Sequence, residues 1–243
     1  MTICHPIISV LLAVSILAAG CSPKQQGPSL AEYALSPQAQ KRQFQAWLSE
    51  QNRILYDPNS PYRDEEAYIS VLEQVIGSPY ADSLQKEQAR RDLPLLRLNR
   101  IGKPAADFSF TLRNGRSRKL SSVKADYILL FFSNPGCADC KRITDILQEE
   151  SVSAGMTASG RLKVVNIYPD DDMEKWFEYS ASYPKEWLSG FSPDVDEPAA
   201  DGLPLYNLRA IPSLYLLDRQ HCTLLKDAPL ERILSYLEEA EDR

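Results

Sequence analysis

Hydrophobic positions recur at steps of three and four residues through the first part of the chain. The stripes are Phe44, Trp47, Leu48 and Leu55, then Tyr68, Val71, Leu72, Val75 and Ile76, and then Leu84, Leu93, Leu96 and Leu98. This spacing places the apolar side chains on one face of each helix, where they normally form a core. We therefore expect a small all-helical region over residues 30–100, to which the pattern assigns no chemistry.

Two helix starts within this region are marked by capping residues. Ser36-Pro37 and Ser78-Pro79 each place a serine, which can accept hydrogen bonds from free N–H groups, before a proline suited to the first helical turn. Pro94 predicts a kink or break in the last helix, because proline cannot donate the backbone hydrogen bond.

The pattern becomes that of strands after residue 101. Residues 108–112 and 118–120 flank Asn114-Gly115, a pair favoured in two-residue hairpins because both positions tolerate positive φ. Residues 127–132 are continuously apolar, as in a strand buried on both faces. The remaining expected elements are a helix through Gln148, a strand over 162–168, a helix over 173–182, strands over 213–217 and 223–226, and a helix over 230–240. The order ββαβαββα predicts an α/β fold with a mixed sheet over residues 101–243, with an insertion rich in Pro, Gly and Asp at about 184–204.

The first twenty residues differ in composition from the rest. From Ile7 to Ala19 the chain is almost wholly apolar, yet this run is shorter than the ~20 residues of a membrane-spanning helix, so it predicts a secretion signal. The sequence LAAGC that ends at Cys21 resembles the lipobox of bacterial lipoproteins, in which cleavage precedes the cysteine and its sulfur takes a diacylglycerol. The resemblance implies a signal peptide over residues 1–20, an acylated (palmitate-bearing) Cys21 and a polar tether over 21–29. The alternative is an ordinary signal that leaves Cys21 as a free thiol.

Charge and cysteine usage narrow the functional classes. The 243-residue chain carries a net charge of -6 and offers no broad basic surface, so nucleic acid is not an expected partner.

The run of three aspartates at residues 170–172 is interpreted as a solvated loop and helix start, and no metal or cofactor is expected. Loss of Cys4 with the signal and acylation of Cys21 leave Cys137, Cys140 and Cys222, one close pair and one spare thiol.

The close pair sits where a buried strand leads into a helix. In this position Cys137 lies at the helix N-terminus, where free N–H groups and the positive end of the helix dipole stabilise a thiolate. Cys140 lies nearly one turn further on, close enough to attack a mixed disulfide formed on Cys137. We therefore expect Cys137 to be the nucleophile and Cys140 the resolving thiol.

Three motifs together resemble the thioredoxin superfamily, in particular the membrane-tethered oxidoreductases related to TlpA and ResA. They are the opening stretch at 106–110 with its hairpin, the strand–Cys-x-x-Cys–helix, and Ala210-Ile211-Pro212-Ser213 before a strand. The resemblance covers residues 103–237 and implies a thioredoxin fold. It also implies that the Ile211-Pro212 bond is cis, lies against the redox pair and presents backbone for substrate docking.

The chain departs from classical thioredoxin around the cysteines. It has Gly136 where thioredoxin has Trp, and Ala138-Asp139 where thioredoxin has Gly-Pro. It also lacks the buried Asp of the preceding strand that assists proton transfer in thioredoxin. Water or Asp139 is therefore the candidate base that removes the proton of Cys140. The negative charge of Asp139 destabilises a thiolate on Cys137, and Lys141 partly offsets this effect. Strongly oxidising pairs depend on a very stable thiolate, so we predict that the Cys137–Cys140 pair is reducing.

These inferences predict a thiol–disulfide oxidoreductase that reduces or isomerises disulfides of exported proteins. We expect it to be lipid-anchored in the cell envelope, facing the periplasm, and to be recycled by a membrane redox partner. A thioredoxin-fold peroxidase is disfavoured, because that family carries Thr or Ser at the position of Asn134. A metal-delivery protein would need ligands beyond the two cysteines, and His221 is the single mature histidine. An inert binding module that holds a partner through its helical region remains the third alternative.

Overall fold

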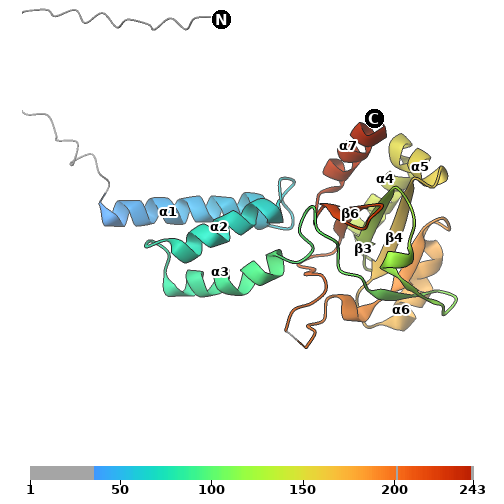
Figure 1. The fold of residues 1–243 in the computed structure, drawn as a ribbon, viewed down its shortest axis with the longest axis horizontal. Coiled ribbons are helices and arrows are strands. Elements are labelled where there is room, and N and C mark those ends of the chain that lie inside the picture. The colour runs from blue at the N-terminus through green and yellow to red at the C-terminus, as the bar shows by residue number, and fades with distance from the viewer. Residues whose placement is uncertain (1–35, 201, 242–243) are drawn as a thin grey trace, which may run out of the picture.

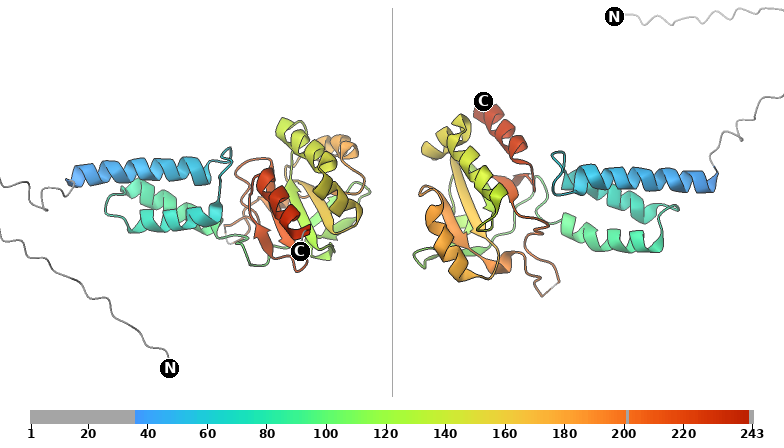
Figure 2. Two further views of the ribbon diagram at one scale, coloured as in Figure 1. Left: turned by 90° about the horizontal axis from the view of Figure 1, so that it is seen from above. Right: turned by 180° about the vertical axis from the view of Figure 1, so that it is seen from behind.

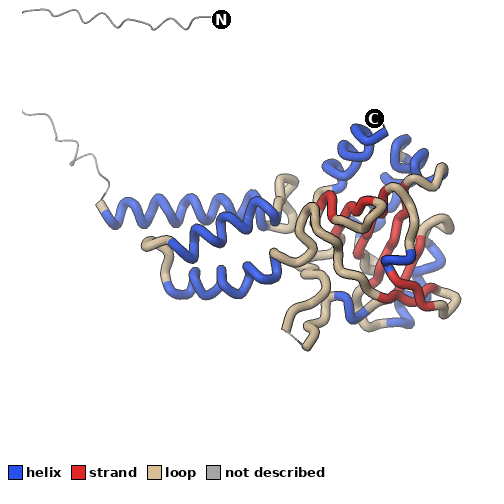
Figure 3. Tube along the Cα trace, viewed as in Figure 1, coloured by secondary structure: helices blue, strands red, loops and turns tan. Residues whose placement is uncertain are grey.

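The computed structural model describes residues 36–200 and 202–241. It has an N-terminal helical region that projects from an α/β part, in which a mixed sheet is flanked by helices (Figures 1 and 3). Within the described ranges, no helix is both long and apolar enough to cross a membrane. The expected signal, the acylation site at Cys21 and the tether lie outside these residues.

Three helices form the helical region: α1 (Pro37–Gln51), which continues into a π-helical turn (Asn52–Tyr56), α2 (Glu65–Gly77) and α3 (Ser83–Leu96). The first predicted start is confirmed, since the Ser36 hydroxyl accepts a hydrogen bond from the Ala39 N–H and Pro37 opens α1. The second is wrong. Ser78 ends α2, and α3 is capped by Asp82, which forms a reciprocal capping box with Gln85.

The apolar stripes of the three helices form one cluster of buried side chains. Leu84 is the exception, because it lies on the outer face of α3 with 71% of its surface exposed. The α3 helix continues through Pro94 to Leu96, so the proline does not split it. Because Pro94 lies in the last turn, the missing donor costs the helix only one terminal hydrogen bond.

The α/β part is built on a seven-stranded sheet with the order β2-β1-β5-β4-β3-β6-β7. Its strands are β1 (Ser109–Leu112), β2 (Ser117–Lys119), β3 (Tyr127–Phe132), β4 (Leu162–Tyr168), β5 (Leu188–Phe191), β6 (Ser213–Asp218) and β7 (Thr223–Leu225). The central β3 pairs in parallel with β4 and antiparallel with β6. Both of its faces are buried, as the continuous apolar run predicts.

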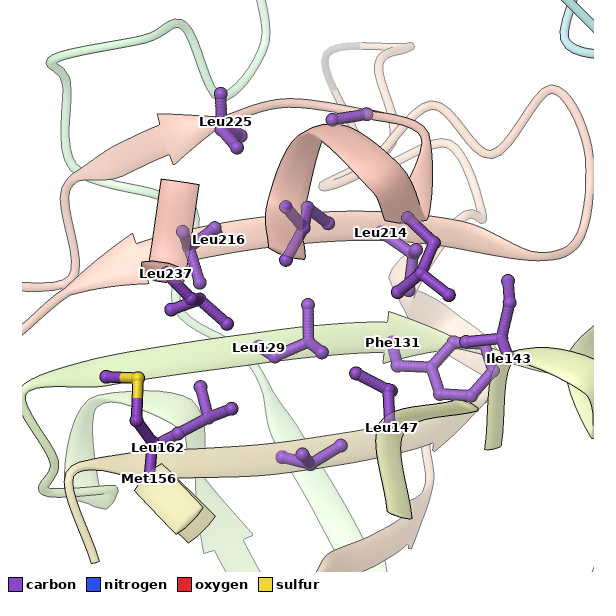
Figure 4. Close-up of a cluster of buried hydrophobic side chains, with 14 of the residues drawn as sticks. Leu129, Phe131, Ile143, Leu147, Met156, Leu162, Leu214, Leu216, Leu225 and Leu237 are labelled. Atoms are coloured by element: carbon purple, nitrogen blue, oxygen red, sulfur yellow. The ribbon is translucent and has the colours of Figure 1, made fainter. Parts of the chain in front are cut away.

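Helices cover the sheet and bury its two faces. The helices are α4 (Ala138–Glu149), α5 (Ser151–Ala158), α6 (Met173–Tyr179) and α7 (Leu230–Glu241). Figure 4 shows Leu129 and Phe131 of β3 packed among side chains that include Ile143 and Leu147 of α4 and Leu237 of α7. The alternate residues of β3 point into a second cluster on the opposite face. The Cys-x-x-Cys segment thus leads from a strand fixed on both faces into a helix fixed on one.

Two features of the sheet differ from the sequence-based expectation. In the hairpin, Gly115 takes a positive φ of 77°, whereas Asn114 does not and instead accepts a hydrogen bond from the Arg116 N–H through its side chain. The predicted insertion contains β5, which pairs in parallel with β4 and antiparallel with β1 and so joins the hairpin to the sheet. At Gly190 a side chain would overlap the ring of Phe110. Helix α5 was also not predicted.

Direct contacts join the helical region to the sheet at one end (Figure 2). The buried Lys226 ammonium donates to the carbonyls of Leu96 and Leu98, each at 2.6 Å. The Asn99 amide donates to the Leu205 carbonyl at 2.8 Å and accepts from the Ala106 N–H at 2.7 Å. These bonds satisfy carbonyls at the end of α3 and fix the helical region at that end.

Candidate active site

The redox pair lies at the start of α4, directly after β3. The Cys137 N–H donates to the Asn134 carbonyl at 3.1 Å, and Gly136 supplies the positive φ of 79° that this tight turn requires. Cys137 is the N-cap of α4, and its sulfur accepts a hydrogen bond from the Cys140 N–H at 3.1 Å. The first cysteine therefore occupies the position in which a helix end stabilises negative charge.

The two thiols have different environments. Both are free, Cys137 is half-buried, and Cys140 is buried with 2% of its surface exposed. Burial, followed by the hydrogen bond with Cys137, raises the pKa of the Cys140 thiol well above its usual range, although the Asn134 backbone N–H acts in the opposite direction. Cys140 therefore holds its proton at neutral pH while Cys137 faces an approaching disulfide. This asymmetry is the one expected of a nucleophilic and a resolving cysteine.

The loop before β6 lies beside the start of α4. The Ile211-Pro212 peptide bond is cis, as predicted. Ile211 and Cys137 pack against the same buried cluster. Pro212 lines a cleft of about 340 Å³ together with Asp139 and Ile143, from the first two turns of α4. The structure thus brings Cys137, Cys140, Ile211 and Pro212 to one end of the sheet.

The charged residues that the sequence singled out lie on the exposed face of α4. The Asp139 side chain is 71% exposed and lies 3.5 Å from the Arg142 guanidinium. Lys141 instead pairs with Asp145 at 2.6 Å. The positive charge nearest to the Asp139 carboxylate is therefore that of Arg142, one residue beyond the predicted Lys141.

A polar network behind the cysteines was not predicted. The buried Ser133 hydroxyl donates to the Asn166 amide oxygen at 2.5 Å and lies 3.1 Å from the Tyr183 hydroxyl. Since Ser133 has one proton, and Asn166 accepts it, Tyr183 is the donor in the second bond. Burial raises the pKa of Tyr183, the hydrogen bonds with Ser133 and Asn166 act in the opposite direction, and the charges of Cys140 and Cys137 raise it. The sequence signal was faint: a serine directly after an apolar strand, and an Asn within the next strand.

The remaining candidates lie apart from this site. The His221 imidazole contacts the Leu120 carbonyl at 3.1 Å, and Cys222 is a half-buried free thiol whose N–H donates to Asp218. Among residues 36–200 and 202–241, no three His, Cys, Asp or Glu side chains gather in a way that could hold a metal ion.

Comparison with known proteins finds matches in both parts of the chain. Residues 14–99, which include the helical region, match the family described as Domain of unknown function (DUF5106). A crystal structure of a thioredoxin-like protein from Bacteroides caccae is 37% identical, with a TM-score of 0.74, and the match covers 82% of this chain and 71% of that one. The C-terminal domain of an uncharacterized protein from Bacteroides fragilis is 40% identical with a TM-score of 0.54, over 58% of this chain and 98% of that one.

Among curated proteins, human nucleoredoxin is 28% identical over 119 residues, which is 49% of this chain. The match spans only 26% of nucleoredoxin. It therefore concerns one part of that longer protein.

Proposed function

This chain belongs to the thioredoxin-like proteins, and from that premise we propose that it is a thiol–disulfide oxidoreductase. Cys137 is the nucleophile and Cys140 the resolving thiol. The observation that carries the proposal is their asymmetry, with a half-buried sulfur that accepts an N–H bond at a helix N-terminus and a second sulfur buried one turn behind it.

The reaction proceeds in two exchanges. The Cys137 thiolate attacks one sulfur of a substrate disulfide, so that the substrate S–S bond breaks, a mixed disulfide forms, and the leaving substrate thiolate takes up a proton. Cys140 then loses its proton, and its sulfur attacks Cys137. This step forms the Cys137–Cys140 disulfide and releases the second substrate thiolate, which is protonated in turn. The substrate gains two electrons and two protons, and a dithiol reductant returns the pair to its starting state.

We infer the biological setting from features of the sequence. The chain resembles the TlpA- and ResA-related oxidoreductases, and the LAAGC boundary at Cys21 resembles a lipoprotein signal. We place the protein at the cell envelope, anchored by lipid at Cys21, where it reduces or isomerises disulfides of exported proteins and is recycled by a membrane redox partner. Metabolic labelling with a palmitate analogue tests the anchor: wild type should be labelled, and equal labelling of Cys21→Ala would rule it out.

The experiment that tests the function is reduction of insulin disulfides by the soluble protein, with dithiothreitol as the dithiol reductant. Wild type should accelerate insulin precipitation, Cys137→Ser should not, and Cys222→Ser, the matched control, should retain the wild-type rate. Peroxide consumption and copper or zinc titration are measured on the same samples. Turnover of peroxide without insulin reduction would favour a peroxidase, and tight metal binding without either activity would favour metal delivery.

A further inference from the structure

The helical region contains a cleft of its own, with a volume of about 450 Å³ that lies in the range typical of small-molecule sites. All three helices that project from the α/β part contribute to its lining (Figure 1), and no residue of the α/β part does. We call it the helical cleft. A ligand held there would not touch Cys137 or Cys140, so the helical cleft concerns a property other than disulfide exchange.

A carboxylate lies at the end of the helical cleft nearer the α/β part. Asp92 of α3 is the single charged residue that lines the cleft. Within residues 36–200 and 202–241 it forms no ion pair, and its one hydrogen-bond partner is the Gln88 amide, which donates to Oδ1 at 2.7 Å. Its second oxygen and its negative charge are therefore available to a ligand.

Two tyrosines line the cleft together with Asp92. Tyr56 and Tyr68 stack with their ring centroids 4.5 Å apart. Burial, followed by the charge of Asp92, raises the pKa of each phenol to about 12, although Arg209 acts in the opposite direction. Tyr68 is only 3% exposed, yet neither phenol has a hydrogen-bond partner among the described residues. Because a buried hydroxyl normally has a partner, this end of the cleft is suited to a ligand that supplies one.

The cation beside the two tyrosines is already paired. The Arg209 guanidinium lies 4.1 Å from the centroid of the Tyr56 ring. It binds the carboxylate of Glu65 at 2.7 Å and that of Asp227 at 3.0 Å, and it does not line the cleft. Its charge is therefore balanced by its own partners, whereas that of Asp92 is not.

Apolar side chains line the middle of the helical cleft, where Leu72 and Val75 of α2 are 4% and 2% exposed. At the end away from Asp92, the side-chain amides of Gln45 and Gln85 exchange two hydrogen bonds, of 3.1 and 2.6 Å, which join α1 to α3. Helix α3 rises about 10 Å between Gln85 and Asp92. The cleft therefore offers room for a short apolar body with one polar end.

We propose that the helical cleft binds a small primary amine with an apolar body, and that its ammonium group lies at Asp92, Tyr56 and Tyr68. An ammonium group has three donors and no acceptor, which match one carboxylate oxygen and two phenol oxygens. An anionic ligand would be repelled by Asp92, and a neutral alcohol would lack the charge-assisted hydrogen bond. The inference gives the helical region a binding role that is independent of the proposed disulfide exchange.

The test is calorimetric titration of the protein with three probes of equal chain length: hexylamine, hexanol and hexanoate. Asp92→Asn removes the charge and keeps the shape of the side chain. Glu87→Gln is the matched control, because Glu87 lies on the same helix and does not line the cleft. Tyr68→Phe removes one acceptor, and Tyr62→Phe, at an exposed position outside the cleft, is its control. Urea unfolding verifies that each variant is folded.

Wild type should bind hexylamine at least about tenfold more tightly than hexanol, because hydrogen bonds to charged groups are the stronger ones. Asp92→Asn should remove this preference, Tyr68→Phe should weaken hexylamine binding severalfold, and the two controls should bind as wild type does. Equal binding of hexylamine and hexanol, tighter binding of hexanoate, no binding of hexylamine at millimolar concentration, or an unchanged affinity in folded Asp92→Asn would overturn the proposal. Insulin reduction, measured on the same samples, reports on Cys137 and Cys140 alone, so its failure would leave the amine site standing.

Discussion

The backbone N–H of Cys140 donates to the sulfur of Cys137 at 3.1 Å, so the amide of the resolving cysteine stabilises the nucleophile. The donor belongs to the first turn of α4, where the N–H groups have no partner within the helix, so the Cys137 sulfur satisfies one of them. Negative charge on Cys137 satisfies that donor better than a neutral thiol does. The geometry therefore favours attack by Cys137 and a slower step that requires Cys140 to ionise.

The first prediction concerns the pH dependence of product release. Because burial raises the pKa of Cys140 well above its usual range, only a small fraction of this thiol is ionised at neutral pH. The thiolate fraction grows with pH below the pKa, so release from a preformed mixed disulfide should accelerate about tenfold per pH unit. Acid-quenched samples across neutral and mildly alkaline pH measure the rate. A flat profile would contradict the assignment of Cys140 as the attacking group.

The second prediction concerns Asp139 and the redox potential. Its carboxylate lies in the first turn of α4 and opposes a thiolate on Cys137, but it is largely exposed and paired with Arg142. Asp139→Asn should stabilise the reduced form and make the couple more oxidising, by on the order of 10 mV given the weakness of exposed charges. Titration in glutathione buffers measures the shift, with Asp145→Asn as the control one turn further on. An unchanged potential, or a wild type as oxidising as the strong periplasmic oxidants, would refute the argument.

The third prediction tests the polar network behind the cysteines. Tyr183→Phe removes the hydroxyl that donates to Ser133, on a group whose pKa the charge of Cys140 raises. Loss of one such hydrogen bond, worth about 1 kcal/mol, should slow resolution of the mixed disulfide roughly fivefold and leave its formation unchanged. Tyr127→Phe, at the far end of β3, is the control. If formation and resolution slow equally, the network has only a structural role.

The fourth prediction concerns the ion cluster between the two parts of the molecule. Glu65→Gln removes the carboxylate that the buried Lys226 and Arg209 share, so Arg209 keeps only Asp227 as an ion-pair partner. Removal of one partner of a buried pair costs about 3–5 kcal/mol in the free energy of unfolding. Glu66→Gln breaks the more exposed pair with Arg100 and should cost no more than about 1 kcal/mol. Urea unfolding measures both variants. Equal losses would show that the cluster does not stabilise the docked helical region.

Local sequence signals predicted the part of the site that is local in the chain. Cys137 and Cys140 are three residues apart. The apolar run before them and the small residues that follow it predict their position between a buried strand and a helix. The strand β4 and the cap at Ser36 were likewise predicted, because each depends on a few neighbouring residues.

Elements that depend on distant partners could not be predicted in this way. Strand β5 is four residues long within a stretch rich in Pro and Gly, and it forms because β4 and β1 offer hydrogen bonds on either side. The misplaced helix start at Ser78-Pro79 has a different cause, because the Asp82–Gln85 capping box that begins α3 spans only three residues and is a local signal. The Glu65–Arg209 pair joins residues 144 positions apart, so no local pattern indicates it.

The most direct test of the oxidoreductase assignment is to trap the mixed disulfide and locate it by mass spectrometry. Cys140→Ser, incubated with oxidised insulin or with an envelope extract, should accumulate a covalent adduct on Cys137 that dithiothreitol releases, because the resolving thiol is missing. Cys137→Ser should form none under the same conditions. An adduct on Cys140 in the Cys137→Ser variant, with none in Cys140→Ser, would contradict the account.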